Sequence, residues 1–150
     1  MSRLVAAGAG FLLAVLWFDL MHDVQVLRRP AGDLPDDVLA SITTYYRRVL
    51  IGARPMNRLV GAVMLATVAG GVAQLVAGDM PRWAAWTALG LIVSPVALAA
   101  VHTVPSALRL ARGVEAPQEQ SRLARCICRD HLCCLVAIAA LLGVELAVGR

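Results

Sequence analysis

Four long apolar stretches constrain this chain more than any other feature of its sequence. A helix needs about 20 mainly apolar residues to cross the hydrocarbon core of a bilayer. The stretches that meet this requirement cover residues 4–26, 56–78, 83–104 and 127–148. Only 16% of the residues are charged, whereas soluble domains have about 25%. The sequence therefore predicts an all-α integral membrane four-helix bundle, a single transmembrane domain over residues 1–150 that is surrounded by the lipid bilayer.

The connections between these stretches differ in length. A turn of four residues, 79–82, joins the second and third stretches, which must therefore form an antiparallel hairpin. The first connection contains Pro35 followed by acidic residues, a pattern that favours the start of a helix. Apolar residues then recur at helical spacing as far as Leu50. This pattern predicts a short amphipathic helix on the membrane surface, ended by Pro55. Residues 105–125 are expected to form a short helix and a turn.

All 14 basic residues are arginine, and their distribution predicts the orientation. Eleven flank the first and third connections: Arg28, Arg29, Arg47, Arg48, Arg54, Arg58, Arg109, Arg112, Arg122, Arg125 and Arg129. Only Arg3, Arg82 and Arg150 lie on the other side. The positive-inside rule then places both long connections in the cytoplasm and both termini outside. We expect the first stretch to be a retained helix, because no small-residue cleavage site follows it.

The same arginines bear on partners and on location. They lie at the ends of apolar runs and form no patch with interleaved aromatic residues, so we expect no nucleic-acid partner. A chain without lysine that is rich in Ala, Val, Leu and Arg is typical of a GC-rich bacterial genome. The expected location is therefore the bacterial cytoplasmic (inner) membrane, which the chain crosses several times.

Ionisable residues within the apolar stretches are the main candidates for function. Asp19, His22 and Asp23 share one face of the first helix, because they are spaced at i, i+3 and i+4. His102 lies near the end of the third helix, and His131 lies near the start of the fourth. At about 1.5 Å per residue, all five lie roughly 22–29 Å from the outer ends of their helices, at one cytoplasmic level. Ionisable groups within a membrane are candidate functional residues, so we predict that these five line a polar site.

Two interpretations of this polar layer remain open. Three imidazoles with neighbouring carboxylates form a ligand set that suits iron, copper or zinc, with an aspartate orienting an imidazole. The metal ligands would be His22, His102 and His131. In the alternative interpretation the layer is purely structural, and Arg125 or Arg129 neutralises Asp130.

Four cysteines, Cys126, Cys128, Cys133 and Cys134, open the fourth helix. The cytoplasm is reducing, so we expect no structural disulfide. Cys126 and Cys133 lie on the same face of the helix as Asp130, an arrangement that suits a soft metal ion such as Cu(I) or Hg(II). In the alternative interpretation they are small packing residues.

Two short segments carry a resemblance to a known family. Residues 105–109, Pro-Ser-Ala-Leu-Arg, follow the third helix, and residues 125–135 place a histidine at the start of the last. In these segments the chain resembles the small four-helix membrane proteins grouped around fungal anthrone oxygenases. It departs from them at Ser106 and Ala107, where the family has Thr and Asn, and it lacks the tryptophan before the last histidine. The resemblance implies an oxygenase or related activity on a hydrophobic aromatic compound, with His131 as the functional residue.

Together these features predict an oxidoreductase-like membrane enzyme that acts on a hydrophobic small molecule; the cofactor is left open, with a transition metal (iron, copper or zinc) as the candidate. The histidines would be ligands or acid–base groups, and Asp19 or Asp23 would orient them or take a proton. The alternative is a non-enzymatic membrane partner subunit or a small transporter, for example of metal ions. A transporter needs a polar path, which one chain lacks but a homo-oligomer could form. Convergence of the five polar residues would favour the enzyme.

Overall fold

The computed structural model describes residues 2–30 and 32–148, and it confirms the all-α fold. These residues contain no strand. The helical elements are α1 (Ser2–Asp23), η1 (Val24–Val26), α2 (Asp36–Tyr46), η2 (Arg47–Gly52), α3 (Arg54–Ala77), α4 (Arg82–Leu98), η3 (Ala99–Thr103), α5 (Val104–Arg112) and α6 (Pro117–Val148). Four helical segments are long and apolar enough to cross a membrane: Ser2–Val26, Arg54–Ala77, Arg82–Arg112 and Pro117–Val148. By the length and composition of its helices the chain is a multi-pass membrane protein.

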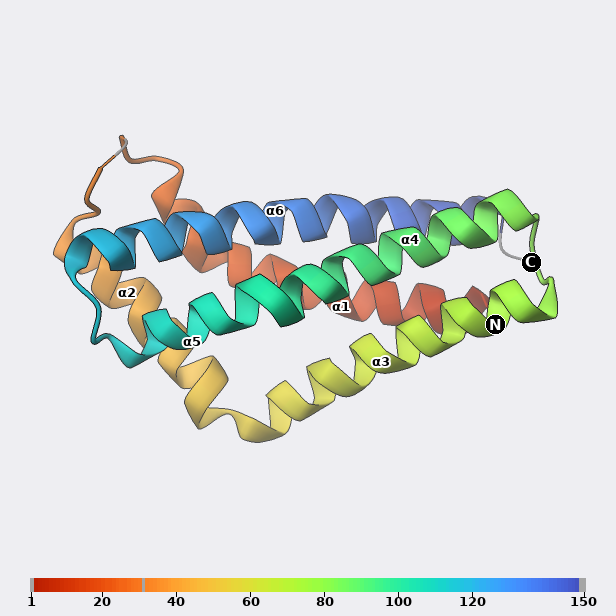
Figure 1. Ribbon diagram of the computed structural model, residues 1–150, viewed down its shortest axis with the longest axis horizontal. Coiled ribbons are helices and arrows are strands. Elements are labelled where there is room, and N and C mark those ends of the chain that lie inside the picture. The colour runs from red at the N-terminus through yellow and green to blue at the C-terminus, as the bar shows by residue number, and fades with distance from the viewer. Residues whose placement is uncertain (1, 31, 149–150) are drawn as a thin grey trace.

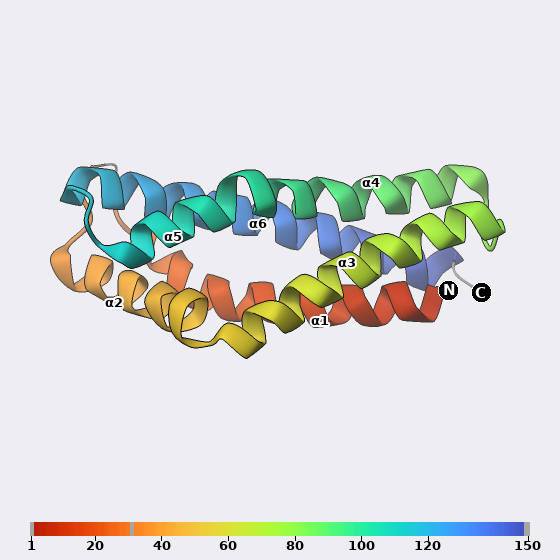
Figure 2. The same ribbon diagram turned by 60° about the horizontal axis from the view of Figure 1, so that its bottom comes forward.

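The four spans form a four-cornered bundle (Figure 1). Both α1 and α4 pack mainly against α3 and α6. The two chain ends lie beside the α3–α4 turn, at what we call the terminal end, and α2 and α5 lie at the opposite end, the α2 end (Figures 1 and 2). At the α2 end, the start of α3 is splayed away from the other three spans (Figure 1).

Apolar side chains cover the outside of the bundle as well as its core. Leu65 and Val76 of α3 and Val136 of α6 are exposed on the bundle surface. Inside, Leu12, Ile92 and other buried apolar residues form the central cluster. A soluble protein rarely exposes large apolar patches, so these outer faces suit contact with lipid.

The third and fourth spans are longer than their apolar stretches. Pro105 does not end the third span, because the helix continues through the wide π turn of η3 into α5 and ends at Arg112. Pro105 lies in the first turn of α5, where a missing backbone N–H is tolerated. The fourth span begins at Pro117 rather than at Ile127. Its first turns are charged and polar, so hydropathy alone does not mark them as part of the span.

The predicted amphipathic helix is present as α2, and its apolar face is covered by protein. Val38, Ile42 and Tyr46 are buried in a cluster with residues of α1, α5 and α6. Leu110 and Ile127 are fully buried in the same cluster. Because α5 and α6 extend beyond their apolar stretches, they supply a protein surface for α2 to pack on. In this way α2 is held across one end of the bundle, next to the polar residues of α1.

The close approach of α1 and α3 at Gly8 gives a first prediction. A Cβ atom at Gly8 would overlap the hydroxyl of Thr67, which is itself buried and donates to the Val63 carbonyl at 2.7 Å. We expect Gly8→Leu to separate the two helices and to lower the free energy of unfolding by about 1–3 kcal/mol. Unfolding in a titration with SDS, followed by tryptophan fluorescence, measures the change. Gly10→Leu is the matched control, since nothing lies within 4 Å of a Cβ atom there; equal losses in the two variants would contradict this packing.

Candidate functional site

A buried carboxylate near the end of α1 joins three elements. Asp23 is 0% exposed, and both of its oxygens accept the Tyr46 hydroxyl, at 2.7 and 2.8 Å. His131 of α6 places its Nδ1 atom 2.6 Å from Asp23 Oδ2. A carboxylate only accepts hydrogen bonds, so this contact assigns a proton to Nδ1. The Nε2 atom is then the ring nitrogen that remains for other chemistry.

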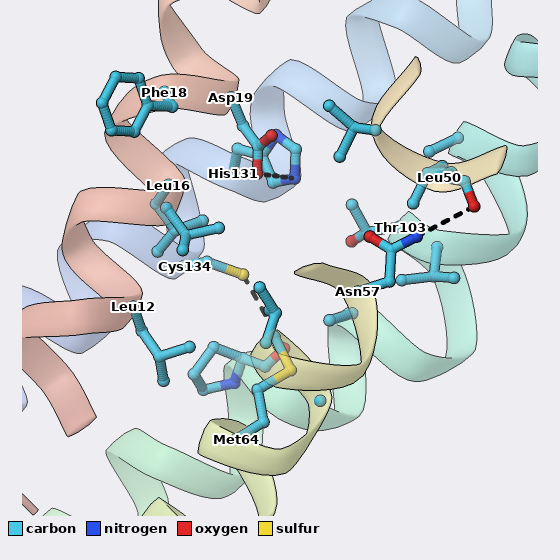
Figure 3. Close-up of a pocket in the computed structure, with 18 of the residues that line it drawn as sticks. Leu12, Leu16, Phe18, Asp19, Leu50, Asn57, Met64, Thr103, His131 and Cys134 are labelled. Atoms are coloured by element: carbon cyan, nitrogen blue, oxygen red, sulfur yellow. Dashed lines mark hydrogen bonds and ion pairs between the residues drawn. The ribbon is translucent and has the colours of Figure 1, made fainter. Parts of the chain in front are cut away.

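A second carboxylate faces that free nitrogen. Asp19 lies one turn before Asp23 on α1, and its Oδ1 atom accepts the Tyr45 hydroxyl at 2.7 Å. Its Oδ2 atom lies 4.0 Å from Nε2 of His131 (Figure 3). That distance is too long for a direct hydrogen bond. The imidazole is therefore bonded to one carboxylate and faces the other, and the predicted association of Asp19, Asp23 and His131 is present in the structure.

His22 lies apart from this group. Its ring stacks on Tyr45 with centroids 3.8 Å apart, and its Nδ1 atom is 3.2 Å from the Phe18 carbonyl oxygen. It lines a separate, shallower hollow together with Arg48. Neighbouring helical residues point about 100° apart, so His22 is turned outward when Asp23 points into the bundle.

His102 belongs to a second pair. Its Nδ1 atom lies 2.5 Å from Asp130 Oδ2, and the Thr103 hydroxyl donates to the same oxygen at 3.1 Å. The Asp130 side chain is buried, whereas that of His102 is 45% exposed. Arg129 approaches Asp130 only to 4.0 Å. Arg125 instead donates to backbone carbonyls of the α1–α2 connection.

The predicted three-histidine metal site is not assembled. Among the residues that the structure describes, no group of three His, Cys, Asp or Glu side chains could hold a metal ion. The reason lies in α6, where Asp130 and His131 are consecutive and so point about 100° apart. Asp130 therefore faces η3 and His102, while His131 faces α1. The residues present do not fit the expected iron, copper or zinc site.

The cysteines of α6 are all free and occupy different environments. Cys128 and Cys134 are buried, Cys126 is half-buried and Cys133 is exposed. The Cys134 thiol lies 3.9 Å from the Pro95 carbonyl oxygen of α4. Among the described residues they form no metal-binding group with Asp130.

A cavity of about 560 Å³ adjoins the free face of His131 (Figure 3). Small-molecule sites commonly measure about 300–1,000 Å³. The cavity lies where α3 is splayed, and most of its lining is apolar, including Leu12, Leu16 and Met64. Asp19 and His131 supply polar atoms at one side. The site thus combines a lipid-like chamber with an imidazole and a carboxylate.

Three polar partners in this region escaped the sequence analysis. They are Tyr45, Tyr46 and Thr103, none of which was predicted to belong to the site. A buried tyrosine usually needs a partner for its hydroxyl. Two adjacent tyrosines on one predicted helix and two aspartates on another could therefore have indicated the Tyr–Asp contacts.

These two tyrosines give a second prediction. Burial and the neighbouring carboxylates, Asp19 for Tyr45 and Asp23 for Tyr46, raise the pKa of both phenols well above the ordinary value. They are the only tyrosines in the chain, so absorbance at about 295 nm reports on this site alone, with free tyrosine titrating near pH 10. The folded protein should show no tyrosinate at about pH 11, whereas unfolded protein should be largely ionised.

The sign of the accompanying stability change follows from the same shift. Because the folded-state pKa of each phenol is raised, its contribution to stability is complete below the unfolded pKa of about 10 and is lost as the pH rises above it. Ionisation of both phenols near pH 10 in protein that is still folded would contradict the buried Tyr–Asp contacts.

Comparison with protein-family models, with curated proteins and with solved structures found no match for this chain. The resemblance to the anthrone-oxygenase group therefore stays a prediction, and the functional argument rests on the geometry of the site.

Proposed function

We propose that the protein takes a lipid-soluble molecule into the cavity and that His131 moves a proton on it as a general acid–base. The observation that carries this proposal is the setting of one imidazole. Its Nδ1 atom is bonded at 2.6 Å to the buried Asp23, while the same side chain lines the cavity beside Asp19. An imidazole held in this way presents Nε2 in a fixed position, and its ordinary pKa near neutrality suits proton transfer.

Each neighbour has a distinct part in this scheme. Asp23 orients the ring and stabilises its protonated form, and Tyr46 keeps Asp23 in place through two contacts to the carboxylate. Asp19 positions the polar group of the ligand or receives the proton. The step proposed here is a proton transfer between His131 and the ligand, with no change of oxidation state; the oxidoreductase-like activity implied by the family resemblance stays a prediction.

A transporter is less well supported by the arrangement of the core. Along α6, the buried apolar residues Ile138 and Leu141 separate His131 from the next buried polar group, Glu145. Glu145 accepts a hydrogen bond from Gln74 at 2.8 Å, near the terminal end. The apolar cluster between the two polar regions offers no polar path for an ion. A partner subunit would need neither the cavity nor an oriented imidazole.

The α2 end is proposed to face the cytoplasm of a bacterium, on the basis of the arginine bias. Val114 lies in the turn between α5 and α6 and is 81% exposed. We predict that Val114→Cys, in a variant whose four native cysteines are alanine, resists a membrane-impermeant maleimide in intact cells and reacts after the membrane is permeabilised. Ready labelling of intact cells would reverse the proposed orientation.

The proposed function is tested in a strain that lacks the gene. Lipid extracts of this strain should contain at least one accumulated compound, the substrate, whose level returns to normal when the wild-type gene is restored. His131→Ala should fail to restore it, although the variant is present in the membrane in equal amount. Cys133→Ala, on the exposed side of the same helix, should restore it fully. Restoration by His131→Ala would remove the basis of the proposal.

A further inference from the structure

We infer that the ligand of this cavity is an amphiphile whose head group donates a hydrogen bond and carries no negative charge, such as a lipid-soluble alcohol or amine. This inference rests on the proposed function, because it specifies the ligand of the same cavity. It follows from three features of the site: the acceptors that remain free, the charges around them and the lining of the chamber.

Two hydrogen-bond acceptors converge on one point of the cavity wall. Nδ1 of His131 carries the proton bonded to Asp23, so Nε2 presents a lone pair, and Oδ2 of Asp19 lies 4.0 Å away. A single ligand atom at about 2.8 Å from each would contact both. Even when Nε2 is protonated, the carboxylate still requires a donor. A ketone, ether or ester head group has no hydrogen to offer and would leave Oδ2 of Asp19 without a donor, since the Tyr45 hydroxyl donates to Oδ1.

The charges around this point disfavour an anion. Asp19 and Asp23 are two carboxylates around a single imidazole, and no arginine is among the residues found to line the cavity. Three arginines of this region lie against other groups: Arg47 donates to the Ala111 carbonyl, Arg125 donates to the α1–α2 connection, and Arg129 lies 4.0 Å from Asp130. A carboxylate or phosphate head group would therefore face Asp19 with no arginine to compensate it, and a protonated His131 would balance only one of the two aspartates.

The rest of the chamber suits a hydrocarbon or aromatic body. Leu16 from α1, Val60 and Met64 from α3, Val96 from α4 and Ile138 from α6 line it, so all four membrane-spanning segments contribute apolar surface. Figure 3 shows His131 and Asp19 at one side of the cavity and Leu12 and Met64 at the other. A ligand with its polar head at Asp19 would extend its apolar part towards α3. The side chains of α3 that line the cavity have the same apolar character as lipid.

The test uses four photoreactive amphiphiles that share one palmitoyl-length chain with a diazirine in the tail. Their heads are a primary alcohol, a primary amine, a methyl ether and a carboxylic acid. The protein is reconstituted in phosphatidylcholine liposomes, irradiated with each probe at neutral pH, and digested, and the labelled residues are mapped by mass spectrometry. Labelling of the α3 peptide that contains Val60 and Met64 reports on occupancy of the cavity.

We expect the alcohol and the amine to label this peptide at least tenfold more than the ether and the acid. In Asp19→Asn, the loss of the charge should raise labelling by the acid, whereas Asp33→Asn, a change at an exposed acid, should leave the pattern unaltered. If the ether or the acid labels the wild-type protein as strongly as the alcohol and the amine do, the head-group inference is overturned, while the cavity remains a binding site. Absence of cavity labelling by all four probes would overturn the proposed function together with this inference.

Discussion

Replacement of Asp23 by alanine is expected to lower the free energy of unfolding by about 3–5 kcal/mol, the largest loss of stability for any single polar residue of the site. The carboxylate is 0% exposed and accepts hydrogen bonds from Tyr46 and His131. Its removal leaves a buried hydroxyl and a buried N–H without their acceptor and opens a gap between α1, α2 and α6. The SDS titration followed by tryptophan fluorescence measures the loss.

Asp33→Ala serves as the matched control, because Asp33 is an exposed acid of the connection between α1 and α2. It should change the free energy of unfolding by less than about 0.5 kcal/mol. An Asp23→Ala protein as stable as this control would show that the carboxylate does not hold α2 against the bundle, and the orientation of His131 would then lack its support.

Replacement of His131 by alanine is expected to have the largest effect on function. General acid–base groups contribute about 10²–10⁴-fold to reaction rates, so the rate of substrate conversion should fall by at least about 100-fold. The loss of stability should be smaller than for Asp23→Ala, about 1–3 kcal/mol, because Asp23 retains the Tyr46 hydroxyl. The two quantities are measured on one preparation in proteoliposomes, with the compound that accumulates in the strain lacking the gene.

The sequence was a good guide to the fold, because each span of the bundle must be apolar over about 20 residues to cross lipid. It was a poorer guide to the ends of the spans. The charged first turns of α6 and the residues of α5 carry no hydropathy signal of a span, and both are held by packing at the α2 end. Helices extended by such contacts are visible only once their partners are placed.

The candidate site could be predicted in part, because the spacing of residues along a helix determines which of them share a face. The spacing of Asp19 and Asp23 puts both on one face of α1, and the structure brings both to His131. Depth along the helices placed the three histidines at one level, but it carried no information on rotation about each axis. That rotation sends His22 to Tyr45 and His102 to Asp130, and so divides the predicted cluster.

The central claim is that His131 acts chemically and not only as a structural partner of Asp23. The most direct test compares His131→Ala with a second variant that is destabilised to a similar degree. Ile42 of α2 is fully buried and is not among the residues that line the cavity, and Ile42→Val should cost about 0.5–1.5 kcal/mol. The measurement is the initial rate of substrate conversion per folded molecule in proteoliposomes of each variant. The account predicts a rate near that of the wild type for Ile42→Val and a rate at least about 100-fold lower for His131→Ala. Equal rates per folded molecule in the two variants would contradict it.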